Sequence, residues 1–200
     1  MNDYLVQTKY AASSLIDLIR TEEIALQDLF STLNSLKGHH QFLYADFRRK
    51  DFDPDDHFNE HQVMHAFALQ AKVRDQIDRV ETKINNLKIS ISSKEESIKA
   101  LSGALLQIAK QGISIVHGNL DNCSSGRIIS NEPVKNIIWQ GRNQSLHYEE
   151  GIYRAPIVNC FNNLGIQLHA INLAKEVIDL LNWTTYDNYQ NDLITLLGYF

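Results

Sequence analysis

Residues 3–37 read DYLVQTKYAASSLIDLIRTEEIALQDLFSTLNSLK, and this stretch decides the fold class of the chain. Alternating steps of three and four residues visit ten positions, and eight of them are apolar. The positions are Leu5, Thr8, Ala12, Leu15, Ile19, Glu22, Leu26, Leu29, Leu33 and Leu36, of which only Thr8 and Glu22 are polar. A heptad seam sustained over more than four repeats is typical of one helix packing on another. Gly38 follows at a position that favours a helix C-terminus. The sequence therefore predicts one helix over residues 3–37.

A second seam repeats the pattern further along the chain. The same alternating step visits eleven positions, and ten of them are apolar. The positions are Val73, Ile77, Val80, Ile84, Leu87, Ile91, Lys94, Ile98, Leu101, Leu105 and Ile108, of which only Lys94 is polar. Asp56 is an acceptable N-cap for this helix, and residues 38–56 are interpreted as a connector. Two matched seams joined by a polar connector predict a long antiparallel, coiled-coil-like helical hairpin over residues 1–92. A capping-box pattern from Ser93 to Glu96 leaves open whether the second helix breaks near Ser93.

The remaining segment, residues 93–200, is expected to form a helical bundle that is continuous with the hairpin as one domain. Glycine and proline divide it into shorter helices, which we expect at residues 94–110, 131–150, 156–181 and 193–200. Gly112 and Gly151 are expected to lie just beyond helix ends, and residues 112–131 to form a loop. Trp139 and Trp183 are expected to anchor the core. Since no stretch supports a β-sheet, the predicted fold class is all-α.

Composition excludes several classes of protein. Three prolines and nine glycines in 200 residues are too few for a collagen-like or disordered chain. The net charge of −5 is spread evenly, with 14 basic and 16 acidic residues in positions 1–110 and 5 and 8 in positions 111–200. This balance argues against non-specific coating of DNA but allows a small local RNA site. The two cysteines make no disulfide framework, so a reduced, cytoplasmic setting is expected, and neither a secretory leader nor a membrane span is expected.

The segment with the most chemical character is IIWQGRNQSLHYEEG, residues 137–151. Histidine titrates near neutral pH, so His147 can accept or donate a proton. Arg142 carries a permanent charge and can bind a phosphate group through two N–H groups. Asn143 lies four residues before His147 and so shares its helix face, whereas Arg142 lies about 140° around the helix from His147.

The Arg142-Asn143-x-x-x-His147 motif resembles the signature of HEPN (higher eukaryotes and prokaryotes nucleotide-binding) domains, over roughly residues 94–200. The resemblance implies an all-helical bundle that works as a metal-independent endoribonuclease, without a cofactor, in toxin–antitoxin or antiviral defence. It implies a homodimer with a composite site, an RNA substrate, and an antitoxin or effector module as a protein partner. It assigns catalysis to Arg142, Asn143 and His147, and their neighbours Tyr148, Glu149 and Glu150 are expected to contact the substrate.

One departure limits the resemblance. Family toxins paired with nucleotidyltransferase antitoxins often carry a modified tyrosine two residues after the histidine. Here Tyr148 follows His147 directly, and Glu149 stands at the expected position. Inactivation by tyrosine modification is therefore not carried over to this chain.

Two other interpretations stay open. In the first, Arg142 pairs with Glu149 or Glu150 and His147 is an interface histidine. The chain is then a non-catalytic HEPN-like helical scaffold that binds a protein partner, nucleotide or RNA. In the second, His57, His61 and His65 bind a metal, because the run from His57 to His61 has an H-x-x-E-H order and helical spacing presents all three imidazoles together. The polar flanks favour a solvated helix start, so we expect no metal site.

Overall fold

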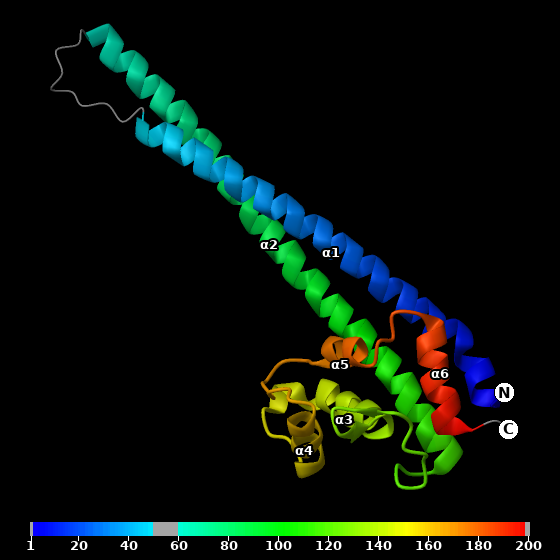
Figure 1. Cartoon of the computed structure of the whole chain (residues 1–200). Helices are drawn as coiled ribbons and strands as arrows, with labels where there is room; N and C mark the ends of the chain where they lie inside the picture. Colours follow the sequence, from blue (N-terminus) through cyan, green and yellow to red (C-terminus); the bar gives the residue numbers. More distant parts are fainter. Residues whose placement is uncertain (1, 50–59, 199–200) are drawn as a thin grey trace. The chain divides into compact units, whose positions relative to one another are not determined.

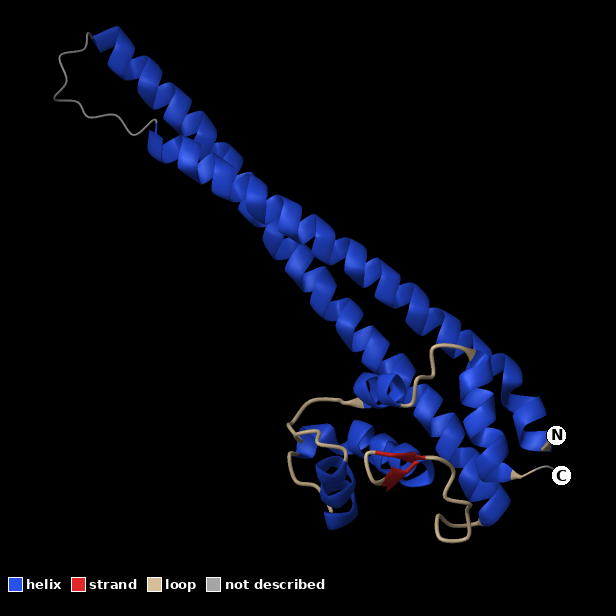
Figure 2. Cartoon of the chain, in the orientation of Figure 1, coloured by secondary structure: helices blue, strands red, loops and turns tan. Residues whose placement is uncertain are grey.

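The computed structural model describes residues 2–49 and 60–198, and within them the all-α prediction is confirmed. The helices are α1 (Asp3–Arg49), α2 (Glu60–His117), α3 (Val134–His147), α4 (Ala155–Asn163), α5 (Ala174–Leu180) and α6 (Tyr186–Leu197), with a 3-10 turn, η1, at Tyr148–Glu150 (Figure 1). Strands β1 (Ile128–Ile129) and β2 (Glu132–Pro133) form one short antiparallel ladder (Figure 2). None of the described helices is both long enough and apolar enough to cross a bilayer.

The chain divides into two compact units, to which α1 and α2 both contribute. The hairpin unit comprises residues 24–95, and the bundle unit comprises the residues up to 23 together with those from 96 onward. The sequence pattern places all of residues 1–92 in the hairpin. In the structure, the start of α1 packs within the bundle unit instead. Tyr4 donates a 2.7 Å hydrogen bond to the carbonyl of Ile108, and Asn2 lies 3.5 Å from the carbonyl of Leu197.

In the hairpin unit, α1 and α2 run side by side in opposite directions, which confirms the predicted antiparallel pair (Figure 1). None of the residues of either predicted seam is exposed. The buried cluster between the two helices is made of Leu33, Leu43, Val73, Ile77, Val80, Ile84 and Ile91. A polar contact of 2.9 Å joins His40 Nε2 to Glu81 Oε1 at the edge of this cluster.

The predicted helix end at Gly38 is wrong, because α1 continues to Arg49. Leu43 is buried and Phe47 packs against the same apolar cluster, so continuing the helix extends the seam. Burying these side chains outweighs the cost of an interior glycine, which is about 1 kcal/mol. Residues 38–49, predicted to belong to the connector, are thus helical, and the proposed N-cap at Asp56 lies outside the described residues.

Helix α2 is unbroken across Ser93 and passes through Gly112 to His117. The buried residues Ile91 and Ile98 keep one face of the helix against its neighbours on both sides of Ser93. Exposed Ser93 therefore sits in a helix interior rather than at a cap, although its pattern allowed a break. The predicted end before Gly112 is wrong, and the irregular segment begins only at Gly118.

In the bundle unit, residues 96–117 of α2 lie against α1, α3, α5 and α6, whereas α4 packs against α3. Leu105, Leu106, Ala109 and Ile113 of this stretch are fully buried. A buried polar network ties the loop after α2 to the final helix. Asp192, which is 7% exposed, accepts hydrogen bonds from Arg127 Nε (2.7 Å), Arg127 Nη2 (2.9 Å) and Trp183 Nε1 (2.9 Å). Trp183 is buried as predicted, whereas the prediction for Trp139 is wrong, since its ring is only half-buried.

The single helix predicted over residues 156–181 is instead two helices, α4 and α5. Gly165 adopts a φ of +72°, and the N–H of Ile166 donates to the carbonyl of Phe161 at 2.9 Å, which is a Schellman-type helix end. The final helix also begins earlier than predicted, at Tyr186. Pro156 in the first turn of α4 and the stop at Gly151 are confirmed.

Candidate functional site

Helix α3 carries the motif, and buried side chains and hydrogen bonds hold it in place. Ile137, Ile138 and Gln144 are buried, and the amide of Gln144 donates to the carbonyl of Ile171 at 2.7 Å. The oxygen of the same amide accepts from the backbone N–H of Leu173 at 3.0 Å, which anchors the segment between α4 and α5. Because these contacts fix the rotation of α3, they also fix where the motif side chains point.

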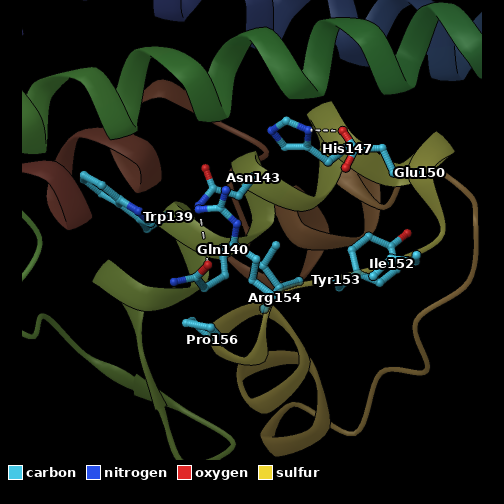
Figure 3. A pocket seen from close by; sticks show the side chains of 10 residues that line it. Trp139, Gln140, Asn143, His147, Glu150, Ile152, Tyr153, Arg154 and Pro156 are labelled. Carbon is cyan, nitrogen blue, oxygen red and sulfur yellow. Dashed lines mark hydrogen bonds and ion pairs between the residues drawn. The ribbon is translucent and has the colours of Figure 1, made fainter.

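A cavity of about 440 Å³ opens beside α3 (Figure 3). Both Asn143 and His147 line it, so the prediction that they share a face is confirmed. The residues around it come from α3, η1, the loop after η1 and the start of α4: Trp139, Gln140, Asn143, His147, Glu150, Ile152, Tyr153, Arg154, Pro156 and Ile157.

Arg142 lies on another face of α3 and is not among the residues that line the cavity. Its Nε donates to Oε1 of Gln107 on α2, and its Nη1 lies 3.4 Å from Oδ1 of Asn143. Burial lowers the pKa of Arg142 from its ordinary value. The motif arginine is therefore engaged by α2 and contacts the cavity through Asn143.

Lys110 of α2 reaches the same asparagine. Its Nζ donates to Asn143 Oδ1 at 3.1 Å and lies 4.5 Å from the centre of the Trp139 ring, a cation–π contact. Burial, together with the positive charge of Arg142, lowers the pKa of Lys110. Within residues 2–49 and 60–198, neither Lys110 nor Arg142 forms an ion pair with a carboxylate. Two cations thus converge on one amide oxygen, and no carboxylate of the described residues pairs with either.

His147 is paired with Glu150 at the other end of the motif. Its Nδ1 lies 2.7 Å from Glu150 Oε1, and both side chains are largely exposed (Figure 3). Because Nδ1 faces the carboxylate, the second ring nitrogen, Nε2, lies on the edge of the ring away from Glu150. Such a pair is a suitable arrangement for a general acid or base.

The three neighbours expected to contact substrate are placed differently from one another. Glu150 lines the cavity, whereas Tyr148 and Glu149 do not. The hydroxyl of Tyr148 donates to Glu149 Oε1 at 3.0 Å. This hydrogen bond and the negative charge of Glu149 raise the pKa of Tyr148. Glu149 thus pairs with Tyr148, and Glu150 pairs with His147. The alternative interpretation, in which one of these glutamates pairs with Arg142, is not what the structure shows.

Sequence reasoning missed five residues around this site: Gln107, Lys110, Trp139, Gln140 and Arg154. Lys110 and Gln107 lie more than thirty positions from their α3 partners, so no local spacing connects them. Arg154 had one usable signal, since it directly precedes the proline-opened helix α4, close to the motif in sequence.

The alternative metal site receives no support from the described part of the chain. His57 lies outside the described residues, and His61 and His65 are exposed on the first turns of α2. Among the described residues, no group of three or more His, Cys, Asp or Glu side chains is placed to hold a metal ion.

No protein-family model, no curated protein and no solved structure matches this chain. The motif and the geometry of the cavity are therefore the features of this chain that bear on its function.

Proposed function

We propose that the chain is a metal-independent endoribonuclease of HEPN type that acts as a toxin or antiviral effector. The observation that carries this proposal is the cavity that brings Asn143 and the carboxylate-paired His147 together. Beside it lie two cations that pair with no carboxylate among the described residues. The proposal keeps His147 as the acid or base and Asn143 as an orienting group. The motif assigns the phosphate contact to Arg142.

The chemistry is an internal transesterification of RNA. His147 Nε2 accepts the proton of the 2′-hydroxyl, and the 2′ oxygen attacks phosphorus. The bond from phosphorus to the 5′ oxygen breaks, and that oxygen takes a proton from a second acid. The products are a 2′,3′-cyclic phosphate and a 5′-hydroxyl, and no redox partner or metal is required. General acid–base catalysis of this kind contributes about 10²–10⁴-fold.

A homodimer would supply the second acid. His147 is largely exposed, so a second copy of the chain can approach it. In a composite site, His147 of one copy accepts the 2′ proton and His147 of the other donates to the leaving oxygen. Light scattering of the full chain, with and without RNA, tests this part of the proposal.

The decisive experiment compares His147→Ala with a matched control, His169→Ala. His169 is another exposed histidine of the bundle unit, outside the cavity, whose described contact is made by its backbone carbonyl. We expect His147→Ala to lower cleavage of a mixed single-stranded RNA pool at least 100-fold, with unchanged circular dichroism. His169→Ala should cleave like the wild type. Equal cleavage by the wild type and His147→Ala would contradict the proposal.

A second candidate is a non-catalytic scaffold, which the surface of the hairpin unit favours. Phe42 on α1 is 66% exposed, and Met64 and Phe67 on α2 are 65% and 53% exposed. Exposed apolar side chains on one helix pair can mark a protein-binding surface. If wild-type protein cleaves no RNA and Phe42→Asp abolishes binding to a co-purifying partner that His147→Ala retains, the scaffold is the better account.

A further inference from the structure

The cavity holds a guanidinium that the motif does not include. Arg154 precedes α4 and lines the cavity together with Asn143 and His147. Figure 3 shows its side chain extending from the start of α4 toward Asn143. An arginine in this place can contact a ligand that also contacts His147.

The two arginines differ in what their N–H groups already bind. Arg142 is half-buried and donates to Gln107 and Asn143. Arg154 is exposed, and its guanidinium has no hydrogen-bond or ion-pair partner among the residues that the structure describes. A phosphate is bound best by two parallel N–H groups from one guanidinium. Arg154 can present such a pair of N–H groups, whereas the Nε–H of Arg142 already donates to Gln107 of α2.

Charge around the cavity is also divided. Lys110 and Arg142 both donate to the oxygen of Asn143, so the end of the cavity near Asn143 is positive. The negative charge of Glu150 is engaged by His147 at the other end. An anion is therefore favoured at the Asn143 end, where Arg154 reaches, next to the imidazole that would handle the proton.

We propose that Arg154 contacts the RNA phosphate directly and that Arg142 is a positioning residue that acts through Asn143. The assignment rests on the proposed function, because it takes the ligand to be an RNA backbone. It moves the phosphate contact from the motif arginine to a residue twelve positions further along the chain.

The first test is equilibrium binding of a fluorescent RNA with 2′-O-methyl groups, which cannot be cleaved, to the full chain. We expect Arg154→Ala to weaken binding at least tenfold and to reduce the salt dependence of binding by about one phosphate contact. Arg154→Lys should recover part of the affinity, because it keeps the charge but loses the bidentate edge. The control is Arg79→Ala, which removes an exposed arginine of the hairpin unit and should change binding less than twofold.

The second test separates the role of Arg142. A positioning role predicts that Arg142→Ala lowers kcat at least tenfold while KM and the salt dependence of binding stay within twofold. Arg142→Lys should recover part of kcat, because an ammonium can still donate to Asn143. A variant that lost activity only by unfolding would also lose the bound RNA and its circular dichroism.

The outcomes distinguish this inference from the proposed function. If Arg142→Ala reduces the salt dependence and Arg154→Ala does not, the phosphate assignment is wrong while the ribonuclease proposal stands. If RNA binds with Arg154-dependent affinity but is never cleaved, the assignment holds and the ribonuclease proposal is wrong. If the wild-type chain binds no RNA, both are wrong.

Discussion

Replacing Gly141 with alanine should destabilise the bundle unit, even though alanine is the better helix former. A Cβ at position 141 would lie 2.8 Å from Cγ1 and 3.1 Å from Cγ2 of Val177 on α5. Val177 is fully buried and, being β-branched, has essentially one χ1 rotamer in a helix, so it cannot swing away. The helices α3 and α5 must then separate, which costs about 2–3 kcal/mol as overpacking. Helix propensity returns about 1 kcal/mol, so the net loss should be about 1–2 kcal/mol.

The assay is urea unfolding of the full chain followed by circular dichroism, with a double-mutant cycle. Val177→Ala alone should cost about 2 kcal/mol by leaving a cavity. In the double variant the clash is gone, so Gly141→Ala should no longer destabilise, and the coupling should be about 2 kcal/mol. Gly103→Ala is the matched control, because a Cβ there meets nothing closer than Ser145 Oγ at 3.6 Å, and it should stabilise by about 0.5–1 kcal/mol.

Two results would refute this reasoning. One is a Gly141→Ala variant at least as stable as the wild type. The other is additivity with Val177→Ala to within about 0.5 kcal/mol, which would show that the two positions do not meet.

Two further predictions concern the bundle unit. Arg127→Ala removes two of the three hydrogen bonds to buried Asp192 and should lower the free energy of unfolding by about 3 kcal/mol, the low end for a broken buried pair because Arg127 is itself half-exposed. Urea unfolding midpoints measure this loss. The control is Arg79→Ala, which breaks an exposed ion pair with Asp75 and should cost under about 1 kcal/mol. Equal losses in the two variants would contradict the prediction. Burial, with a smaller contribution from the charge of Glu132, raises the pKa of the Cys160 thiol to about 12 from an ordinary 9.0. Between pH 9 and 12 the folded state therefore keeps a proton that the unfolded state loses. The free energy of unfolding is highest below pH 9 and falls as pH rises toward 12, by at most about 1.4 kcal/mol per pH unit. Cys160→Ser should flatten this fall in urea titrations between pH 8 and about 10.5, and an unchanged slope would show that the thiol is not responsible.

The role of a glycine in this chain could not be predicted from the sequence alone. Gly38, Gly112 and Gly141 all lie inside helices, although the first two were predicted to end them. A Cβ at position 112 would lie 2.7 Å from the ring of Tyr4, which is more than a hundred residues away. A glycine needed for close approach and one that ends a helix look alike in the sequence. The difference lies in the neighbour, which only the folded chain provides.

The candidate site divides in the same way. That Asn143 and His147 share a helix face follows from their spacing of four, and the sequence alone predicted it. That a cavity lies beside this face is seen only in the structure. That Arg142 faces away follows from the same geometry, but its partner Gln107 could not be predicted. Lys110 meets Asn143 only because α2 and α3 pack together.

The sequence by itself determined the all-α class, the paired seams of α1 and α2, and the face of α3 that carries Asn143 and His147. These features depend on periodicity, which is a property of neighbouring residues along the chain. Only the tertiary structure decided that α2 continues past Ser93 and Gly112, that the start of α1 belongs to the bundle unit, and that Arg154 enters the cavity. Those outcomes depend on burial and contact between residues far apart in sequence, and local propensities of about 1 kcal/mol per residue are too small to oppose them.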